Sequence, residues 1–291
     1  MMPHNNPPPE CIAILGHPSL SGAIEEAAVV SAYLAEQGVT TVHGSTYDET
    51  LRQRIQACEF DMLITLGGDG TLLKTGHLAA PLDIPVLGIN MGHFGFLYEV
   101  QRNNWRGVLS LLLKGDYWLE KRMMLRAELW HGDQVSGPWE VLNDVVVARG
   151  QVVRPVQLTA QVDGIMLASF VADGLITSTA TGSTAYALAA GGPILPPELR
   201  NILIMPVAPH LSVDRAIVLP EGTSVTITVN TAHQAVMSVD GQPSILMADG
   251  DKVKVVASSY NLHFVRFQDP GYFYRNLTTY MEQNPSIGNS R

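Results

Sequence analysis

One glycine-rich segment has the composition of a phosphate-binding loop. Residues 66–73 read Leu-Gly-Gly-Asp-Gly-Thr-Leu-Leu. They follow directly on the apolar run 62–66, which is typical of a buried strand. Glycines let a backbone approach a phosphate closely, and the free amides and the dipole of a helix start favour an anion. The ordinary alternative is a tight turn in which Asp69 caps the helix, and the segment alone leaves both interpretations open. Its pattern is neither that of a Rossmann dehydrogenase nor that of a P-loop nucleotidase.

Other polar groups stand at the ends of expected strands. Residues 177–186 hold six Ser and Thr residues and end in Tyr186, so they could bond a polar ligand and stack on a flat one. Asn143-Asp144 precedes one apolar run, and Asp173-Gly174 follows another. A Ser/Thr-rich loop and ordinary turns are the alternatives for these segments.

The elements that must position these groups change along the chain. Up to about residue 120, runs typical of strands alternate with stretches of helical periodicity, which predicts a mostly parallel sheet with helices on its faces. The expected strands are 11–15, 39–42, 62–66 and 84–89. The expected helices are 22–37, 48–57, a short one just before the strand at 84–89, and one that begins in residues 184–190. Further on, short runs rich in β-branched residues predict a β-rich domain. These runs are 125–130, 141–148, 156–162, 224–229, 252–256 and 262–267.

We therefore expect an α/β N-terminal domain over residues 1–120 that carries the glycine-rich loop, and a β-rich C-terminal domain over 121–265. A C-terminal segment, 266–291, can return to the first domain. The net charge of −9 argues against a general nucleic-acid or membrane surface. No apolar run approaches the roughly 18 residues of a membrane span. The start of the chain lacks a signal-peptide pattern, and two cysteines without metal or redox spacing favour the reducing cytoplasm.

Taken together, these segments resemble the NAD kinase family. The resemblance rests on blocks that follow one another in the family's order: 67–71, 88–97, 143–144, 172–176, 181–186, 191–194 and 238–242. The first block is shared with lipid kinases, whereas the hydroxyl-rich block is highly specific. Ala180 replaces the family's usual proline, Phe94 its commoner leucine, and Asp144 its commoner glutamate, which has a longer reach.

The resemblance implies transfer of the γ-phosphoryl group of ATP to the 2′-hydroxyl of the adenosine ribose of NAD, which gives NADP. It makes Asp69 the residue that accepts the proton of this hydroxyl or orients it. The implied substrate contacts are Gly68, Gly70 and Thr71 at the phosphates, Asn143 and Asp144 at ribose hydroxyls, Asp173 at the nicotinamide end, Thr184, Ala185 and Tyr186 at the adenine, Ala187, Leu188 and Ala189 lining the site, Phe96 near the adenine, and Gln242 at the pocket edge. Lys74 and Arg154 stand where the family can carry a basic phosphate contact, and solvated surface residues are the equal alternative.

The resemblance also implies Mg²⁺ or another divalent cation with ATP, NAD and ATP as small-molecule partners, and a homodimer or homotetramer. No protein-held metal site is expected. Phosphoryl transfer depends on positioning and charge neutralisation, so one carboxylate and a glycine-rich loop can suffice. Two other functions stay open: a lipid kinase, which a lipid phosphorylation assay would reveal, and a sensor that binds NAD without turnover.

Overall fold

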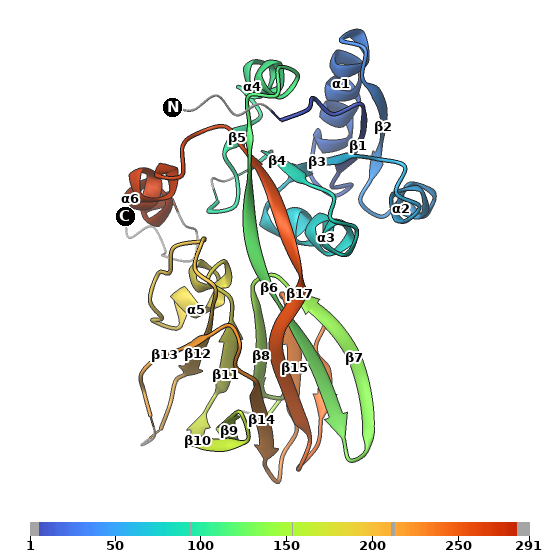
Figure 1. The fold of residues 1–291 in the computed structure, drawn as a ribbon. Helices are drawn as coiled ribbons and strands as arrows, with labels where there is room; N and C mark the ends of the chain where they lie inside the picture. The colour runs from blue at the N-terminus through green and yellow to red at the C-terminus, as the bar shows by residue number, and fades with distance from the viewer. Residues whose placement is uncertain (1–5, 93–94, 153, 211–212, 284–291) are drawn as a thin grey trace. The chain divides into compact units, whose positions relative to one another are not determined.

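The computed structural model in Figure 1 describes residues 6–92, 95–152, 154–210 and 213–283. The chain divides into two compact units, the first made of Met1–Arg122 and Tyr260–Arg291 and the second of Met123–Ser259. Both boundaries fall inside long strands, β6 (Trp118–His131) and β17 (Lys252–Arg266).

The first unit is built on a parallel sheet in the order β17-β4-β3-β1-β2. Its strands are β1 (Cys11–Gly16), β2 (Thr40–Ser45), β3 (Met62–Gly67) and β4 (Val86–Asn90), with a short β5 (Val100–Gln101) beside β4. β3 and β4 are buried along their whole length, as parallel strands covered on both faces are. Successive side chains of each strand point to opposite faces of the sheet, and helices cover both faces.

The helices of this unit differ in the face that they cover. α1 (Ala23–Glu36) and α4 (Trp105–Leu112) share a core with Ile12, Ile64 and Leu87. α3 (Asp69–Ala79) packs on the opposite face, where the side chain of Leu72 lies beside Gly88, and α2 (Glu49–Gln56) packs against α3. The short η1 (Ala80–Leu82) follows α3, and α6 (Tyr272–Gln283) is the last described element.

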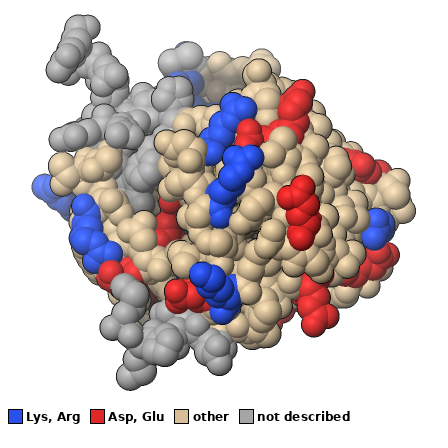
Figure 2. All heavy atoms as spheres, turned by 90° about the horizontal axis from the view of Figure 1, so that it is seen from above, with Lys and Arg blue, Asp and Glu red and all other residues tan. Residues whose placement is uncertain are grey.

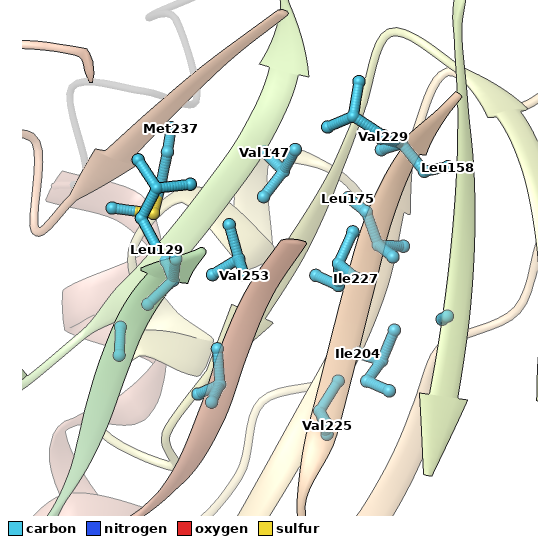
Figure 3. Packing of buried hydrophobic residues seen from close by; sticks show 14 of the residues in the cluster. Leu129, Val147, Leu158, Leu175, Ile204, Val225, Ile227, Val229, Met237 and Val253 are labelled. Atoms are coloured by element: carbon cyan, nitrogen blue, oxygen red, sulfur yellow. The ribbon is translucent and has the colours of Figure 1, made fainter. Parts of the chain in front are cut away.

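The second unit is a pair of antiparallel sheets. One has the order β10-β9-β14-β17, and the other has the order β13-β12-β11-β8-β15-β16. The strands not yet given are β7 (Gln134–Val141), β8 (Asp144–Arg149), β9 (Val156–Val162), β10 (Ile165–Ala172), β11 (Gly174–Ser178), β12 (Asn201–Val207), β13 (Ile217–Pro220), β14 (Val225–Asn230), β15 (Ala235–Val239) and β16 (Ile245–Met247). Figure 3 shows side chains of both sheets, such as Ile227 and Leu175, meeting in one core. Two short helices, η2 (Gly182–Thr184) and α5 (Tyr186–Ala189), follow β11.

None of the described helices has the length and apolar character needed to cross a lipid bilayer. On the face drawn in Figure 2, the described basic side chains are interspersed with acidic ones, and large areas carry neither.

The expected fold, a mostly parallel α/β N-terminal domain and a β-rich C-terminal domain, is confirmed. The strands expected at 252–256 and 262–267 are parts of the single strand β17, so the predicted break between them is wrong. Asp173-Gly174 is not a hairpin turn, since Gly174 already begins β11. The helices α4 and α6 and most strands after residue 160 had no predicted counterpart. His93, Phe94 and the segment from residue 284, which the sequence suggests is disordered, lie outside the described residues.

Candidate functional site

The glycine-rich loop lies where the parallel sheet opens. In the sheet, β2 lies on one side of β1 and β3 on the other. The direction in which the chain adds strands therefore reverses between β1 and β3, and the loops that follow these two strands emerge at this switch point. Ligands of open α/β sheets bind at such points, beyond the carboxyl ends of the strands.

The geometry of the loop excludes a capping role for Asp69. α3 begins at Asp69, and its N-cap is Gly68, which has no side chain to offer. The Gly68 carbonyl accepts hydrogen bonds from the amides of Thr71 (2.8 Å) and Leu72 (3.2 Å). Thr71 packs so tightly on Gly67 that a Cβ added to Gly67 would lie 2.2 Å from Thr71 Oγ1. Asp69 accepts no hydrogen bond from the described residues, so its carboxylate is available to a ligand.

A pocket of about 340 Å³ opens at this loop. It brings together all five residues predicted for the phosphate side with three from the loop after β1: His17, Ser19, Leu20, Gly68, Asp69, Gly70, Thr71 and Lys74. A Cβ added to Gly68 or Gly70 would meet nothing within 4 Å, so the loop backbone faces open space. The amides at the start of α3 and the positive end of its dipole favour an anion there.

The carboxylate of Asp69 is open to solvent on one side and closely packed by protein on the other. Although the residue reaches solvent, the backbone of Gly95 comes so close that a Cβ there would lie 2.6 Å from Asp69 Oδ1. Desolvation by this surrounding protein raises the pKa of Asp69 to about 6. A carboxylate in that range is a competent proton acceptor at neutral pH.

Lys74 stands exposed on α3 at the wall of the same pocket. Its ammonium group donates to the Tyr47 hydroxyl and lies 4.3 Å from the centre of the Tyr47 ring. The ring of His17 packs edge-on against Tyr47, with centroids 6.1 Å apart. Tyr47 therefore holds the positive charge of Lys74 beside the loop. Tyr47 was not among the residues predicted for the site.

In the second unit, Asn143 and Asp144 form a tight corner at the start of β8. The carboxylate of Asp240 holds this corner by accepting hydrogen bonds from the amides of Leu142 (2.7 Å), Asn143 (2.7 Å) and Asp144 (2.9 Å). Burial and the charge of Asp240 raise the pKa of Asp144 to about 7, against a hydrogen bond from the Tyr186 amide. Among the described residues, the buried Asn143 Oδ1 has no partner, which leaves it for a ligand.

The hydroxyl-rich segment holds itself together, which agrees with the alternative of a Ser/Thr-rich loop for residues 178–183. Ser178 donates to the Asn143 carbonyl (3.0 Å), Thr179 to the Leu142 carbonyl (2.6 Å) and Ser183 to the Ala180 carbonyl (2.7 Å). All three are fully buried. Their hydroxyls fix the turn that presents Tyr186, which is 46% exposed at the start of α5.

The other predicted contacts are spread over both units. Thr184 bonds the Thr181 carbonyl (3.1 Å), and Ala185, Ala187, Leu188 and Ala189 surround or follow Tyr186, with Ala187 buried. Asp173 pairs with Arg149 at 3.1 Å, Gln242 lies exposed after β15, and Arg154 is exposed before β9. Phe96 is buried in the first unit, where its ring centroid lies 6.4 Å from that of Phe273. Within the described residues, no cluster of three His, Cys, Asp or Glu side chains could hold a metal.

Two family models match the chain: the ATP-NAD kinase N-terminal domain over residues 13–117 and the C-terminal domain over residues 142–267. A curated NAD kinase of Dehalococcoides mccartyi is 37% identical over 275 residues, which cover 94% of this chain and 96% of that protein. One from Heliobacterium modesticaldum is 43% identical over 80% of this chain and 82% of its own. The chain belongs to the NAD kinase family.

Solved structures agree in fold with this family member. A yeast NADH kinase complexed with NADH superposes with a TM-score of 0.81 at 23% identity, covering 97% of this chain and 91% of that chain. An Archaeoglobus fulgidus NAD kinase in complex with ATP gives 0.74 at 24% identity, with 96% and 100% covered.

For this NAD kinase family member, sequence reasoning missed residues that work through distant partners. Asp240 was part of a matched block, but its bonds to the 142–144 corner could not be read from its own neighbours. Tyr98, whose hydroxyl donates to the Gly68 carbonyl at 2.8 Å, gave no sequence signal apart from lying just after a matched block.

Proposed function

We propose that this enzyme transfers the γ-phosphoryl group of ATP to the 2′-hydroxyl of the adenosine ribose of NAD, yielding NADP and ADP. The observation that carries the proposal is the 37% identity to a curated NAD kinase over 94% of the chain. The pocket at residues 68–74 supports it, because it offers a carboxylate, a lysine and helix-start amides together.

In the proposed reaction, the 2′-oxygen bonds to the γ-phosphorus while the bond from that phosphorus to the β–γ bridging oxygen breaks and ADP leaves. Asp69 accepts the proton of the hydroxyl, and its pKa of about 6 leaves it mainly ionised at neutral pH. The backbone at Gly68, Gly70 and Thr71 and the ammonium group of Lys74 orient the phosphates.

A divalent cation such as Mg²⁺ is proposed to arrive on ATP. Asp69 is the sole carboxylate among the described residues that line the pocket, which suits a metal chelated mainly by phosphates rather than by protein. The cation would neutralise charge on the transferring phosphoryl group.

The NAD contacts proposed in the second unit follow the polar groups of the 143–144 corner. Asn143 Oδ1 is buried without a partner among the described residues, and together with the Asp144 carboxylate it is suited to ribose hydroxyls. Tyr186 offers its exposed ring to the adenine. Asp173 and Gln242 are proposed at the nicotinamide end and the pocket edge, Phe96 near the adenine, and Arg154 at a phosphate.

We further propose a homodimer or homotetramer assembled through the second unit. The edge strands β10, β13 and β16 expose Ile165, Met166, Val218 and Leu246, and exposed strand edges need pairing or protection. Light scattering at micromolar concentration should report a multiple of 31.5 kDa, and a 31.5 kDa particle would refute the assembly. The free thiols Cys11 and Cys58 support placing the reaction in the cytoplasm.

A coupled assay for NADP formation from NAD and Mg²⁺-ATP tests the proposed reaction. Turnover that needs both substrates is expected. NAD binding without turnover would indicate a sensor, and phosphorylation of a lipid instead of NAD would indicate a lipid kinase.

A further inference from the structure

Gly95 and Tyr98 both contact the phosphate loop, and neither has a role in the reaction as proposed so far. Gly95 contacts the Asp69 carboxylate, and the Tyr98 hydroxyl donates to the Gly68 carbonyl at 2.8 Å. One short segment thus touches the loop on both sides of the peptide bond that joins Gly68 to Asp69.

The ring of Tyr98 occupies a place made for it. Tyr98 is 1% exposed, and its ring lies against Gly88 of β4, where a Cβ would come within 2.8 Å of two ring carbons. Any larger residue at position 88 would displace the ring. Burial, and then the nearby charge of Asp69, hold the pKa of Tyr98 well above its usual value, so its hydroxyl keeps its proton and remains a donor.

The neighbouring peptide is anchored to the interior. Arg266 donates to the Leu97 carbonyl at 3.0 Å and to the buried Glu120 carboxylate at 2.8 Å. Glu120 also accepts from the Tyr272 hydroxyl at the start of α6. Tyr98 therefore reaches the loop from a rigid base.

We propose that Tyr98 is a positioning residue for the phosphate loop. Its hydroxyl fixes the carbonyl that caps α3, and thereby orients the Asp69 carboxylate and the first amides of α3 toward the pocket. This inference rests on the proposed kinase function for its consequence in turnover. Catalysis by positioning is sensitive to such support, because a misplacement of about 1 Å can cost roughly 100-fold in rate.

The test compares Tyr98→Phe with Tyr117→Phe. Tyr117 lies in the same unit, is 6% exposed, and its hydroxyl donates to the Pro7 carbonyl at 2.9 Å, so both variants lose one bond of the same kind. We expect kcat of Tyr98→Phe to fall about 10-fold with KM for NAD changed less than about twofold, while Tyr117→Phe keeps kcat within about twofold. Amide hydrogen exchange across residues 69–72 should quicken in Tyr98→Phe alone.

Equal kcat and equal exchange in the two variants would overturn the inference, even if both proteins melt at a lower temperature. If the unaltered enzyme makes no NADP, the proposed function fails, and the exchange comparison still decides whether Tyr98 orders the loop. Should Tyr98→Phe not fold, Gly88→Ala, which displaces the ring but keeps the hydroxyl, is measured in the same way with the same two outcomes.

Discussion

Asp69 and Glu120 are acidic residues of the same unit, yet their pKa values move in opposite directions. Burial opposes ionisation of Glu120, but Arg266 at 2.8 Å and Arg122 at 2.9 Å outweigh it and lower the pKa to about 2. Asp69 has no cationic partner among the described residues, and desolvation raises its pKa to about 6. The presence of a paired cation separates the two cases.

The difference indicates which carboxylate holds the structure and which is left for chemistry. A carboxylate neutralised by two guanidinium groups and bonded to Tyr272 cannot accept a proton near neutral pH, but it fixes the elements that carry its partners. A desolvated and unpaired carboxylate in a pocket is in an unfavourable state that a substrate can relieve, and such groups cluster at functional sites.

The largest expected effect follows from Asp69→Asn. The variant keeps the size of the side chain but removes the proton acceptor, so kcat should fall about 10²- to 10⁴-fold. In the unaltered enzyme kcat should also decline below pH 6, the pKa of Asp69, and the variant should lack this decline. Steady-state kinetics across pH, with a melting curve for each protein, measure both.

Asp48→Asn is the matched control, because Asp48 does cap a helix by accepting from the Leu51 amide at 3.1 Å. It should retain both kcat and stability, since Asn caps as well as Asp. A loss in Asp69→Asn of less than about threefold would assign proton acceptance to another group.

Glu120→Gln should act on stability instead. The substitution removes the carboxylate that two buried guanidinium groups share, and breaking a buried ion pair in this way typically destabilises by about 3–5 kcal/mol. Because folding lowers the pKa of Glu120 from 4.5 to about 2, its stabilisation is complete above pH 4.5 and is lost as the pH falls toward 2. The difference in melting temperature between the variant and the unaltered protein should therefore shrink in acid.

The matched control for Glu120→Gln is Glu221→Gln. Glu221 pairs with Arg200 on the surface, where the Arg200 side chain is 39% exposed. This surface pair should contribute less than about 1 kcal/mol. Equal losses in the two variants would mean that the buried cluster does not hold the unit together.

The sequence predicted the parallel sheet because buried strands and amphipathic helices leave periodic patterns. It also placed the residues of the phosphate loop, since they are consecutive and share one strand-to-helix junction. β17 was split in two because Ser258, Ser259, Tyr260 and Asn261 interrupt its apolar alternation.

The supporting contacts could not be predicted, since they join residues far apart in sequence. Asp240 bonds Asn143 across 97 positions, and Arg266 bonds Glu120 across 146. A lone aspartate before glycine and a lone arginine in a strand have no local signal of such partners. The sequence left the role of the hydroxyls of residues 178–183 open for the same reason, because their acceptors include carbonyls of residues 142 and 143.

Asp144→Asn should strengthen the fold and weaken NAD binding. Folding raises the pKa of Asp144 from 3.8 to about 7, so the stability linked to its proton is complete below pH 3.8 and is lost as the pH rises through 7. The neutral variant avoids that loss and should be more stable above pH 7 by up to about 4 kcal/mol, with little difference near pH 4.

KM for NAD should rise about 10-fold in Asp144→Asn, because a charge-assisted bond to ribose is lost. Asp163→Asn in the same unit is the control, since Asp163 is exposed and accepts from the Ser224 amide at 2.8 Å. The stability difference between Asp144→Asn and the unaltered protein should be larger at pH 8 than at pH 4. An equal difference at both pH values would contradict the cost assigned to burying the Asp144 charge.

The smallest expected effect is that of Tyr186→Ala. The substitution removes the exposed ring but keeps the backbone amide that bonds Asp144, so the 143–144 corner should stay intact. An aromatic face over a base is worth about 1 kcal/mol, and KM for NAD should therefore rise about fivefold with kcat little changed. Tyr274→Ala, which removes a ring that is 54% exposed on α6, should leave KM as it is. If both variants keep the KM of the unaltered enzyme while remaining folded, Tyr186 does not contact the adenine, and recognition of the base must come from another side chain.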